Sequence, residues 1–309
     1  MSKFLIIHPE ELSVKWISRL RALNVDTLGI HSCGGTNAHM YLQNMIENLK
    51  NENVQELLNM AKEQGLNVEY ELHSASYLLP RELFETHPEY FRVDSEGKRT
   101  SQANFCVSSS EALKIVSKRA AELAQSLYMS SDKFYFWLDD GKDLHCHCEK
   151  CRGLSPSDQQ LIALNAMLEE IQKIRSDAKL AYLAYCTTID APKKIKPHKD
   201  IFLEYAPFLR DRSKPASVMN SNEKENIKAL FELFGKKDSK ILEYWYDNSM
   251  FSGWKKPPKY LSVDNDMMLD DIAFYRELGF ENIGSFACFL GQDYEELHGE
   301  PDMIAFKTV

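Results

Sequence analysis

Two adjacent carboxylates, Asp139 and Asp140, end a short apolar run that begins at Lys133. A carboxyl group at the end of a buried strand suits acid–base chemistry, because α/β barrels place their active sites there. Cleaving a glycosidic bond needs one acid to protonate the leaving oxygen and a second group to stabilise the transition state. Neighbouring residues point in different directions, so the two aspartates cannot face each other across one bond. Either one aspartate orients the substrate and the other is the acid, or Asp140 works with a carboxylate from another strand, such as Glu243 or Asp247. The alternative is a polar turn. The candidate catalytic residues are therefore Asp139, Asp140 and Glu243.

A group of cysteines follows directly after the aspartates, with Cys146, Cys148 and Cys151 inside six residues. Three thiolates need one more ligand to complete a tetrahedral zinc site. We favour Cys106 as this ligand, because its loop and the cysteine loop follow neighbouring strands; His145 and His147 are the alternatives. Three thiolates make a metal electron-rich and poor at activating water, so we expect a structural zinc. Free cysteines that pack a loop are the other interpretation.

The rest of the chain alternates between short apolar runs and helical patterns. Most of the runs are nearly continuous and rich in aromatic or β-branched residues, which is typical of strands covered on both faces. We predict eight strands, at Phe4–Pro9, Thr27–Ser32, Asn67–Ser74, Lys133–Asp139, Lys179–Cys186, Ile201–Ala206, Lys240–Asp247 and Asn282–Phe289.

Apolar residues recur at helical spacing between these strands. The clearest helix begins at Ser155 and Pro156, a capping residue followed by a proline suited to the first helical position. Further helices are predicted at 53–64, 111–127 and 223–234. The gap between Cys186 and Ile201 is too short for a full helix.

Eight strands that alternate with helices over about 300 residues are typical of a (β/α)8 TIM barrel. The alternative is an open doubly wound sheet, but the first strand is followed by the sequence HPEE from His8, which cannot cradle a phosphate as a glycine-rich loop does. We therefore predict an α/β fold with a single barrel domain over residues 1–309, and long loops after strands three, four and seven.

Polar and aromatic residues gather at the predicted strand ends, which converge on one mouth in a barrel. A carboxylate inside an apolar strand is costly unless it is paired or used. Structural ion pairs are one explanation. Acids together with aromatic rings favour a sugar site, since C–H faces stack on rings and hydroxyl groups donate to carboxylates. We expect Glu243, Trp245 and Asp247 to share one strand face. The candidate substrate-binding residues at strand ends are His31, Glu71, His73, Tyr185, Glu204, Trp245, Tyr246 and Asp247.

Composition excludes several classes of function. The net charge is −9 and there is no basic face, which argues against nucleic acid as a partner. No apolar run approaches the ~20 residues of a membrane helix. The first residues, MSKFLIIHPEELS, lack the features of a secretory signal, so we expect a cytoplasmic location without disulfides. The sequence does not indicate an oligomeric state.

Several segments together resemble a known family: EYELHSASYLLP, HPEYF, GKR, QANFCVSS and DDG followed by CHCEKC, and later YLAYCTTIDAPKKIKPHKDIFLEYAPFLR. They are similar to a bacterial family of glycoside-hydrolase-like barrels of long-uncharacterised function from polysaccharide-utilisation systems. That family resembles endo-β-N-acetylglucosaminidases, and more distantly α-glucuronidases and β-hexosaminidases.

The resemblance implies a (β/α)8 fold, an oligosaccharide substrate and no cofactor for the chemistry. It implies that Asp139 orients an N-acetyl group and that Asp140 is the general acid. The related enzymes usually have Asp-Glu at these positions, whereas this chain has the shorter Asp140 as the second residue. The resemblance further implies that the site is lined by His73, Arg99, Gln102, Tyr185 and Arg210.

Three functions follow from these observations. The first is a glycoside hydrolase acting on an oligosaccharide that contains N-acetylhexosamine or uronic acid. The second is a non-hydrolytic carbohydrate-binding or regulatory barrel that has lost the catalytic acid. The third is a metal-dependent hydrolase that uses the thiolate and histidine cluster.

Overall fold

The computed structural model describes all 309 residues, and its eight strands form one closed parallel barrel. Strand order around the barrel follows chain order, and β1 closes the ring by pairing with β8. The predicted (β/α)8 fold is therefore confirmed. The strands are β1 Ser2–Ile7, β2 Thr27–Ile30, β3 Asn67–His73, β4 Lys133–Trp137, β5 Lys179–Tyr185, β6 Ile201–Ala206, β7 Lys240–Glu243 and β8 Asn282–Phe286.

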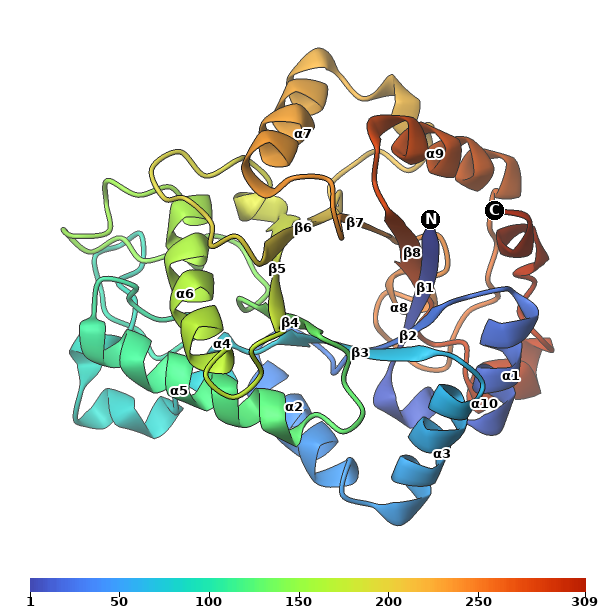
Figure 1. The fold of residues 1–309 in the computed structure, drawn as a ribbon, viewed down its shortest axis with the longest axis horizontal. Coiled ribbons are helices and arrows are strands. Elements are labelled where there is room, and N and C mark those ends of the chain that lie inside the picture. The colour runs from blue at the N-terminus through green and yellow to red at the C-terminus, as the bar shows by residue number, and fades with distance from the viewer.

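Helices surround the barrel, as the view down the ring of strands shows (Figure 1). Between β5 and β6 there is only a 3-10 turn, Cys186–Thr188, as the short gap in the sequence predicts. The helices are α1 Val14–Ala22, α2 Ala38–Asn48, α3 Glu52–Glu63, α4 Ala75–Leu78, α5 Ser110–Ser126, α6 Pro156–Ile171, α7 Ser221–Phe234, α8 Asn248–Phe251, α9 Asn265–Leu278 and α10 Gln292–His298.

Helix starts follow the capping residues in the sequence. The Ser155 hydroxyl accepts a hydrogen bond from the Asp158 amide, and the Asp158 carboxylate accepts one from the Ser155 amide. This capping box, with Pro156 at the first helical position, fixes the start of α6. Ser109 caps α5 more simply, because its hydroxyl accepts a hydrogen bond from the Ala112 amide without a reciprocal bond. Both helices flank the loops that carry the aspartates and the cysteines.

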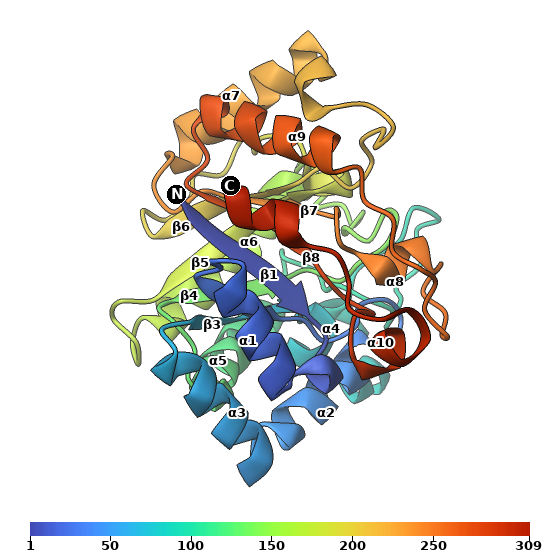
Figure 2. The same ribbon diagram turned by 90° about the vertical axis from the view of Figure 1, so that its right-hand side faces the viewer.

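The loops after β3, β4 and β7 are long, as predicted, and span residues 74–109, 138–155 and 244–264. The first contains α4 and the third contains α8. Figure 2 shows α8 and α10 at the end of the barrel toward which β1 points. This is the end at which barrel enzymes build their sites.

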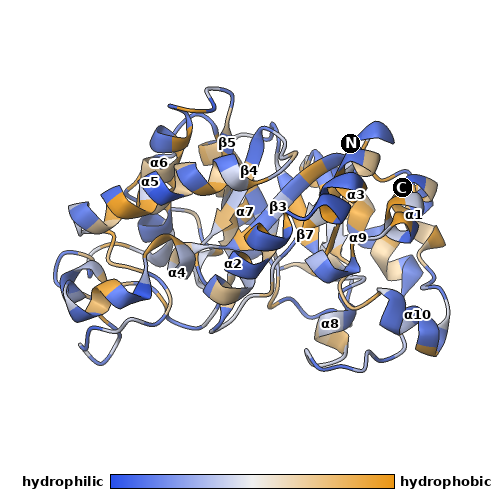
Figure 3. Ribbon diagram, turned by 90° about the horizontal axis from the view of Figure 1, so that it is seen from below, coloured by the Kyte–Doolittle hydropathy of each residue, from blue (hydrophilic) through white to orange (hydrophobic).

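Apolar side chains fill two layers. The larger layer, of 66 buried residues, lies between the strands and the helices, and a smaller group of 12 occupies the barrel interior. Figure 3 shows hydrophobic residues on the strands and on the helix faces that pack against them, with hydrophilic outer faces. No helix combines the length and the hydrophobicity that crossing a membrane requires.

One ammonium group and three carboxyl groups lie inside the barrel. The Lys240 ammonium contacts Glu71, and its Nζ lies 3.5 Å from Glu69 and 3.7 Å from Glu204. It also lies 4.1 Å from the centre of the Tyr135 ring. Burial raises the pKa of Glu71 and raises the pKa of Glu204 well above its ordinary value. Three carboxyl groups around one cation thus remain stable because they are not all ionised.

Replacing Lys240 by Met is expected to destabilise the protein by about 3–5 kcal/mol, because it leaves buried carboxylates without their cation. The measurement is urea unfolding followed by circular dichroism. A matched control is Lys15→Met, whose ammonium lies at the surface between Glu295 and Glu300 and whose removal should leave the urea midpoint nearly unchanged. An equal, small effect of both substitutions would show that the buried group is not an ion-pair network.

Candidate active site

A cavity of about 530 Å³ opens at the carboxyl ends of the strands, and every strand or the loop after it contributes to its wall. This volume lies within the range of ~300–1,000 Å³ that is usual for small-molecule sites. Its 21 lining residues are His8, His31, Cys33, Gly34, Gly35, Tyr41, His73, Trp137, Asp140, Leu183, Tyr185, Ala206, Phe208, Leu242, Tyr244, Asp247, Ser249, Trp254, Phe286, Cys288 and Phe289.

Aromatic rings form much of this wall. The Tyr244 ring centre lies 5.5 Å from Phe286 and 5.3 Å from Phe208, and Tyr185 lies 5.5 Å from Phe208. Of the predicted site residues, Tyr185 is the only aromatic one that lines the cavity. Trp137 and Phe286, which end their strands, were not predicted. Their inward positions on β4 and β8 follow from period-two alternation once the strand ends are known.

Two carboxylates line the cavity, Asp140 after β4 and Asp247 after β7. Asp140 is exposed, and its Oδ1 accepts a hydrogen bond of 3.0 Å from the Tyr185 hydroxyl. Asp247 is buried and caps α8. Its Oδ1 accepts hydrogen bonds from the Ser249 hydroxyl and the Met250 amide, which leaves Oδ2 without a protein partner. Burial raises the pKa of Asp247, and the two hydrogen bonds oppose this rise.

Three imidazoles line the wall formed by β1, β2 and β3. His8 Nδ1 lies 3.0 Å from the His31 carbonyl oxygen, and His31 Nδ1 lies 2.7 Å from the Glu71 carbonyl oxygen. His73 Nδ1 lies 2.7 Å from the Leu138 carbonyl oxygen. Each ring is thus held by the backbone of a neighbouring strand. The predicted residues His31 and His73 do lie at the mouth, together with His8.

Asp139 lies beside the cavity rather than in its wall. Its Oδ1 accepts hydrogen bonds from the amide and the hydroxyl of Ser76, and its amide donates to Asn104. It borders a separate hollow of about 40 Å³ that shares His73 and Tyr185 with the main cavity. Burial raises the pKa of Asp139. The strand ends at Trp137, and the following turn directs the two aspartates to different places.

Of the residues predicted on β7 to line the mouth, only Asp247 reaches the cavity. Glu243 does not reach the cavity: it accepts hydrogen bonds from Arg210 and from Tyr275 of α9, each of 2.7 Å. Arg210 also pairs with Asp271 of α9, and the Trp245 indole donates to the same Asp271. Glu243, Arg210 and Trp245 therefore belong to a buried network between β7 and α9. This corrects the expectation that they line the mouth.

The shared face that we expected for Glu243, Trp245 and Asp247 is also wrong, because β7 ends at Glu243. Strand alternation does not continue beyond that residue. Asp247 reaches the cavity from the start of α8, and Tyr246 is buried in the core with its ring centre 5.8 Å from that of Phe306.

The remaining predicted binding residues also lie away from the cavity. Glu71 and Glu204 are in the barrel interior with Lys240. Arg99 donates to the Phe91 carbonyl oxygen within the loop after β3, and Gln102 lies in the same loop. Neither lines the cavity, so this loop is organised by its own contacts.

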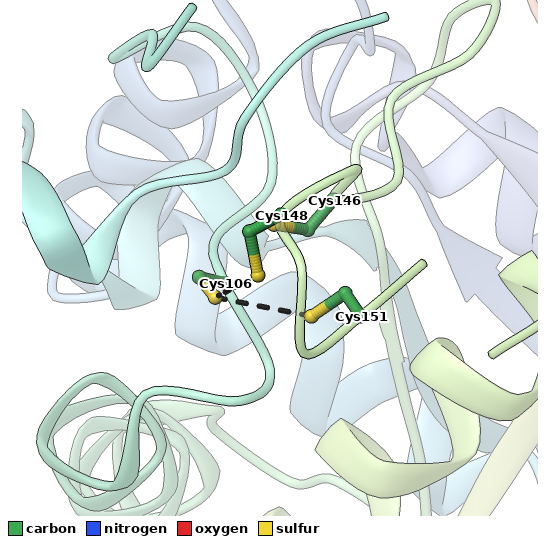
Figure 4. A group of neighbouring side chains, drawn as sticks. All are labelled: Cys106, Cys146, Cys148 and Cys151. Atoms are coloured by element: carbon green, nitrogen blue, oxygen red, sulfur yellow. Dashed lines mark hydrogen bonds between the residues drawn. The ribbon is translucent and has the colours of Figure 1, made fainter. Parts of the chain in front are cut away.

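Four cysteines, Cys106, Cys146, Cys148 and Cys151, form the predicted cluster. Figure 4 shows that they come from two neighbouring loops and point toward a common centre. All four sulfur atoms lie within 4.8 Å of one another. Two of the distances, from Cys106 to Cys148 and to Cys151, are 3.7 and 3.9 Å. No disulfide is formed. Such a cluster can hold a structural metal.

The sequence matches the family described as domain of unknown function DUF4838 over residues 22–298, so the chain belongs to this family. No curated protein gives a significant match. The expectation that the chain resembles a family of uncharacterised function is confirmed.

Solved structures similar to this chain include glycoside hydrolases with TIM-barrel domains. A β-galactosidase from the psychrophilic Marinomonas ef1 has a TM-score of 0.57 at 12% identity over 92% of this chain and 54% of its own. A GH20 module of the pneumococcal exo-β-D-N-acetylglucosaminidase StrH has a TM-score of 0.51 at 11% identity over 99% and 82%. The chain thus spans about half the length of the β-galactosidase. At these identities the likeness shows the fold alone.

Proposed function

We propose that the protein is a glycoside hydrolase that cleaves an oligosaccharide, with Asp140 as general acid and Asp247 as the second carboxylate. One observation supports this most: two carboxylates from non-neighbouring strands, β4 and β7, line a single aromatic-walled cavity at the barrel mouth. Aromatic rings suit the C–H faces of sugars, and two carboxyl groups flanking a bond are what glycoside hydrolysis requires. The glycoside-hydrolase fold of the similar structures is consistent with the proposal.

The environments of the two acids support this division of roles. Asp140 is exposed, so it can recover a proton from solvent after it has protonated the glycosidic oxygen. The C–O bond then breaks, and water completes the reaction to give two shorter sugars. Asp247 is buried and oriented by Ser249 and the Met250 amide, with Oδ2 free for the anomeric carbon or the attacking water. Whether the configuration is retained or inverted follows from the separation of the carboxyl groups in a substrate complex.

An alternative use of the site employs the acetamido group of an N-acetylhexosamine as nucleophile, oriented by Asp139. Ser76 occupies Asp139 Oδ1, and the Asp139 carboxylate borders the smaller hollow and does not line the main cavity. The pair of Asp140 and Asp247 therefore has more support. An N-acetylhexosamine still fits the proposal as a sugar bound in the cavity.

The experiment that tests this function is a screen of the full chain against aryl and alkyl glycosides of neutral sugars, N-acetylhexosamines and uronic acids. We expect release of a reducing sugar from at least one of them. If a sugar binds in the cavity but no glycoside is cleaved, the protein is a carbohydrate-binding barrel instead.

The pH dependence of turnover provides a separate prediction. Asp247 acts in its ionised form, and burial raises its pKa, so kcat/KM should fall as the pH decreases through this raised value. The Ser249 hydroxyl favours the ionised form by donating to Asp247. In Ser249→Ala the acid limb of the pH–rate profile should therefore move to higher pH. An unchanged limb would exclude Asp247 as the group that must be ionised.

We propose further that the four-cysteine cluster binds a structural zinc ion. A Zn–S distance of ~2.3 Å places the four sulfurs of a tetrahedron ~3.8 Å apart, close to the two distances given above. The Val93 amide donates to Cys146 Sγ over 3.3 Å, and the Ser108 hydroxyl lies 3.0 Å from Cys151 Sγ. Such outer contacts orient thiolate ligands. The ion would join the loops after β3 and β4 and so fix the segment that carries Asp140.

An oligosaccharide is the partner that this proposal implies. The cytoplasmic location expected from the sequence stays a prediction.

A further inference from the structure

The loop between β4 and α6 carries a second group of possible metal ligands beside the four cysteines. Its members are Asp143, His145 and His147, and their ligand atoms all lie within 4.8 Å of one another. The two histidines alternate along the chain with Cys146 and Cys148 of the cysteine cluster, and the two groups share no residue. One short segment thus contributes to a group of sulfur atoms and to a separate group of nitrogen and oxygen atoms.

Both imidazoles of this group approach the same carboxylate oxygen. Asp143 Oδ1 lies 2.7 Å from His147 Nε2 and 3.1 Å from His145 Nδ1. The first contact is a hydrogen bond, whereas the second is not aligned as one, and His145 Nδ1 is buried without a protein hydrogen-bond partner. Two ligand atoms held at ~2.0–2.1 Å from one ion are ~2.9–3.4 Å apart. Both separations are close to this range, and a shared ion would give His145 Nδ1 the partner that it lacks.

Contacts with neighbouring segments hold the backbone of this loop. The His147 amide donates to a carbonyl oxygen of the loop after β3 over 2.8 Å, and the Asn104 side chain donates to the Leu144 carbonyl oxygen over 3.1 Å. The buried Gln159 side chain of α6 bonds to both the amide and the carbonyl group of Cys146. The possible ligands therefore stand on a backbone that is already fixed, which lowers the cost of binding an ion.

The charge and the exposure of the group suit a cation from solvent. No lysine or arginine is paired with the Asp143 carboxylate, and Arg92 instead lies 3.5 Å from the Asp143 carbonyl oxygen. The Asp143 side chain is 43% exposed, so an ion can enter and water can complete its coordination. Imidazole nitrogen suits ions such as Zn²⁺ and Ni²⁺, whereas Mg²⁺ and Ca²⁺ prefer oxygen ligands.

We propose that Asp143, His145 and His147 bind a divalent transition-metal ion, such as Ni²⁺ or Zn²⁺, at a site separate from the cysteine cluster. Three protein ligands and an open side make this ion exchangeable, so gel filtration should remove it and leave the structural zinc in place. His145 also lines the small hollow that Asp139 borders. The ion thus fixes the turn that follows the two aspartates. This inference does not depend on cleavage of a glycoside.

Calorimetric titration of the purified full chain with Ni²⁺ at neutral pH tests the proposal. We expect one Ni²⁺ to bind at this site without loss of zinc from the cysteines, and no comparable binding of Mg²⁺. In Asp143→Asn, His145→Asn and His147→Asn this binding should weaken at least ~10-fold, because even residues that only support a ligand contribute ~10- to 100-fold to metal affinity. Asn tolerates the left-handed backbone at position 143, where φ is +52°, so that variant should keep its fold.

A matched control is His87→Asn. His87 Nδ1 lies 3.2 Å from Glu89 Oε1, an exposed imidazole–carboxylate pair without a second imidazole, so its loss should leave Ni²⁺ binding unchanged. Co²⁺ gives a second measurement, because thiolate ligands produce an intense sulfur-to-cobalt charge-transfer absorption and nitrogen or oxygen ligands do not. We expect added Co²⁺ to bind without this absorption. The melting midpoint should rise as Ni²⁺ is added to the parent, and it should rise less in the three ligand variants.

Three results would overturn the proposal. The first is the absence of Ni²⁺ binding by the parent, which would show that Asp143 and His147 form only a hydrogen-bonded pair. The second is equal Ni²⁺ binding by the parent and by His145→Asn. The third is a Co²⁺ complex with the thiolate absorption, which would place the added ion at the cysteines.

Discussion

Asp140→Asn is expected to hydrolyse an alkyl glycoside about 10²- to 10⁴-fold more slowly than the unmodified protein, the usual contribution of a general acid. An amide cannot protonate the leaving oxygen, and no other acid in the cavity wall stands on the β4 side. An aryl glycoside with a nitrophenol leaving group departs without protonation, so the loss should be much smaller with that substrate. Initial rates of the two substrates, measured side by side, give the comparison.

The second carboxylate should behave differently from the acid. Asp247→Asn is expected to slow both substrates strongly, because the group that acts at the anomeric centre is needed whatever the leaving group. Asp211→Asn is a matched control, since Asp211 is an exposed aspartate paired with Lys214 outside the cavity. Equal losses for the two leaving groups in Asp140→Asn would contradict its role as the acid. Full activity of both cavity variants would show that the chemistry lies elsewhere.

Removal of the proposed zinc is the second change with a large expected effect. Metal analysis should find one zinc per chain. If zinc is present at ~1,000 times its dissociation constant, its removal lowers the free energy of unfolding by ~4 kcal/mol. Cys106→Ser should lose the zinc and unfold at lower temperature, because Cys106 is the only ligand from the loop after β3. The measurement combines metal content with thermal unfolding, with and without a chelator.

The control for this prediction is Cys186→Ser, a free cysteine outside the cluster, which should retain the zinc. A protein without metal, in which a thiol reagent modifies all four cysteines of the cluster under native conditions, would refute the zinc site. Loss of zinc that spares the fold but abolishes turnover would instead favour a metal-dependent hydrolase.

The barrel could be predicted because its strands are short apolar runs at regular spacing, separated by helical patterns. The cysteine cluster could also be predicted, since three of its members are close in sequence and Cys106 follows the preceding strand. The position of Asp140 at the mouth could be predicted for a similar reason. In each case the feature depends on local spacing together with the general geometry of a barrel.

The partners of Glu243 could not be predicted in this way. This residue looks like a mouth residue from its strand, but it binds Arg210 and Tyr275, which come from distant segments. Nothing in the spacing indicates that α9 supplies its partners. The burial of Lys240 could not be predicted for a related reason. A lysine at the start of a strand is usually at the surface, whereas the Lys240 ammonium is paired with Glu71 and Glu204 inside the barrel.

Asp247 lies beyond the end of β7, and the sequence contains a local signal for this position. Asp247 is a suitable N-cap residue, and its side chain accepts a hydrogen bond from the Met250 amide at the start of α8. An N-cap at Asp247 predicts that β7 ends before this residue. Asp247 is then expected at the barrel mouth, whatever the position of Glu243. Helix capping thus decides which carboxylate of this segment lines the cavity together with Asp140.

The most direct test of the central claim is a crystal structure of Asp140→Asn with a bound oligosaccharide. We predict a sugar in the cavity, with the bond to be cleaved between residues 140 and 247 and the sugar rings in contact with the aromatic wall. An oligosaccharide bound outside the cavity, or one whose glycosidic bond is out of reach of both carboxylates, would contradict the proposed site.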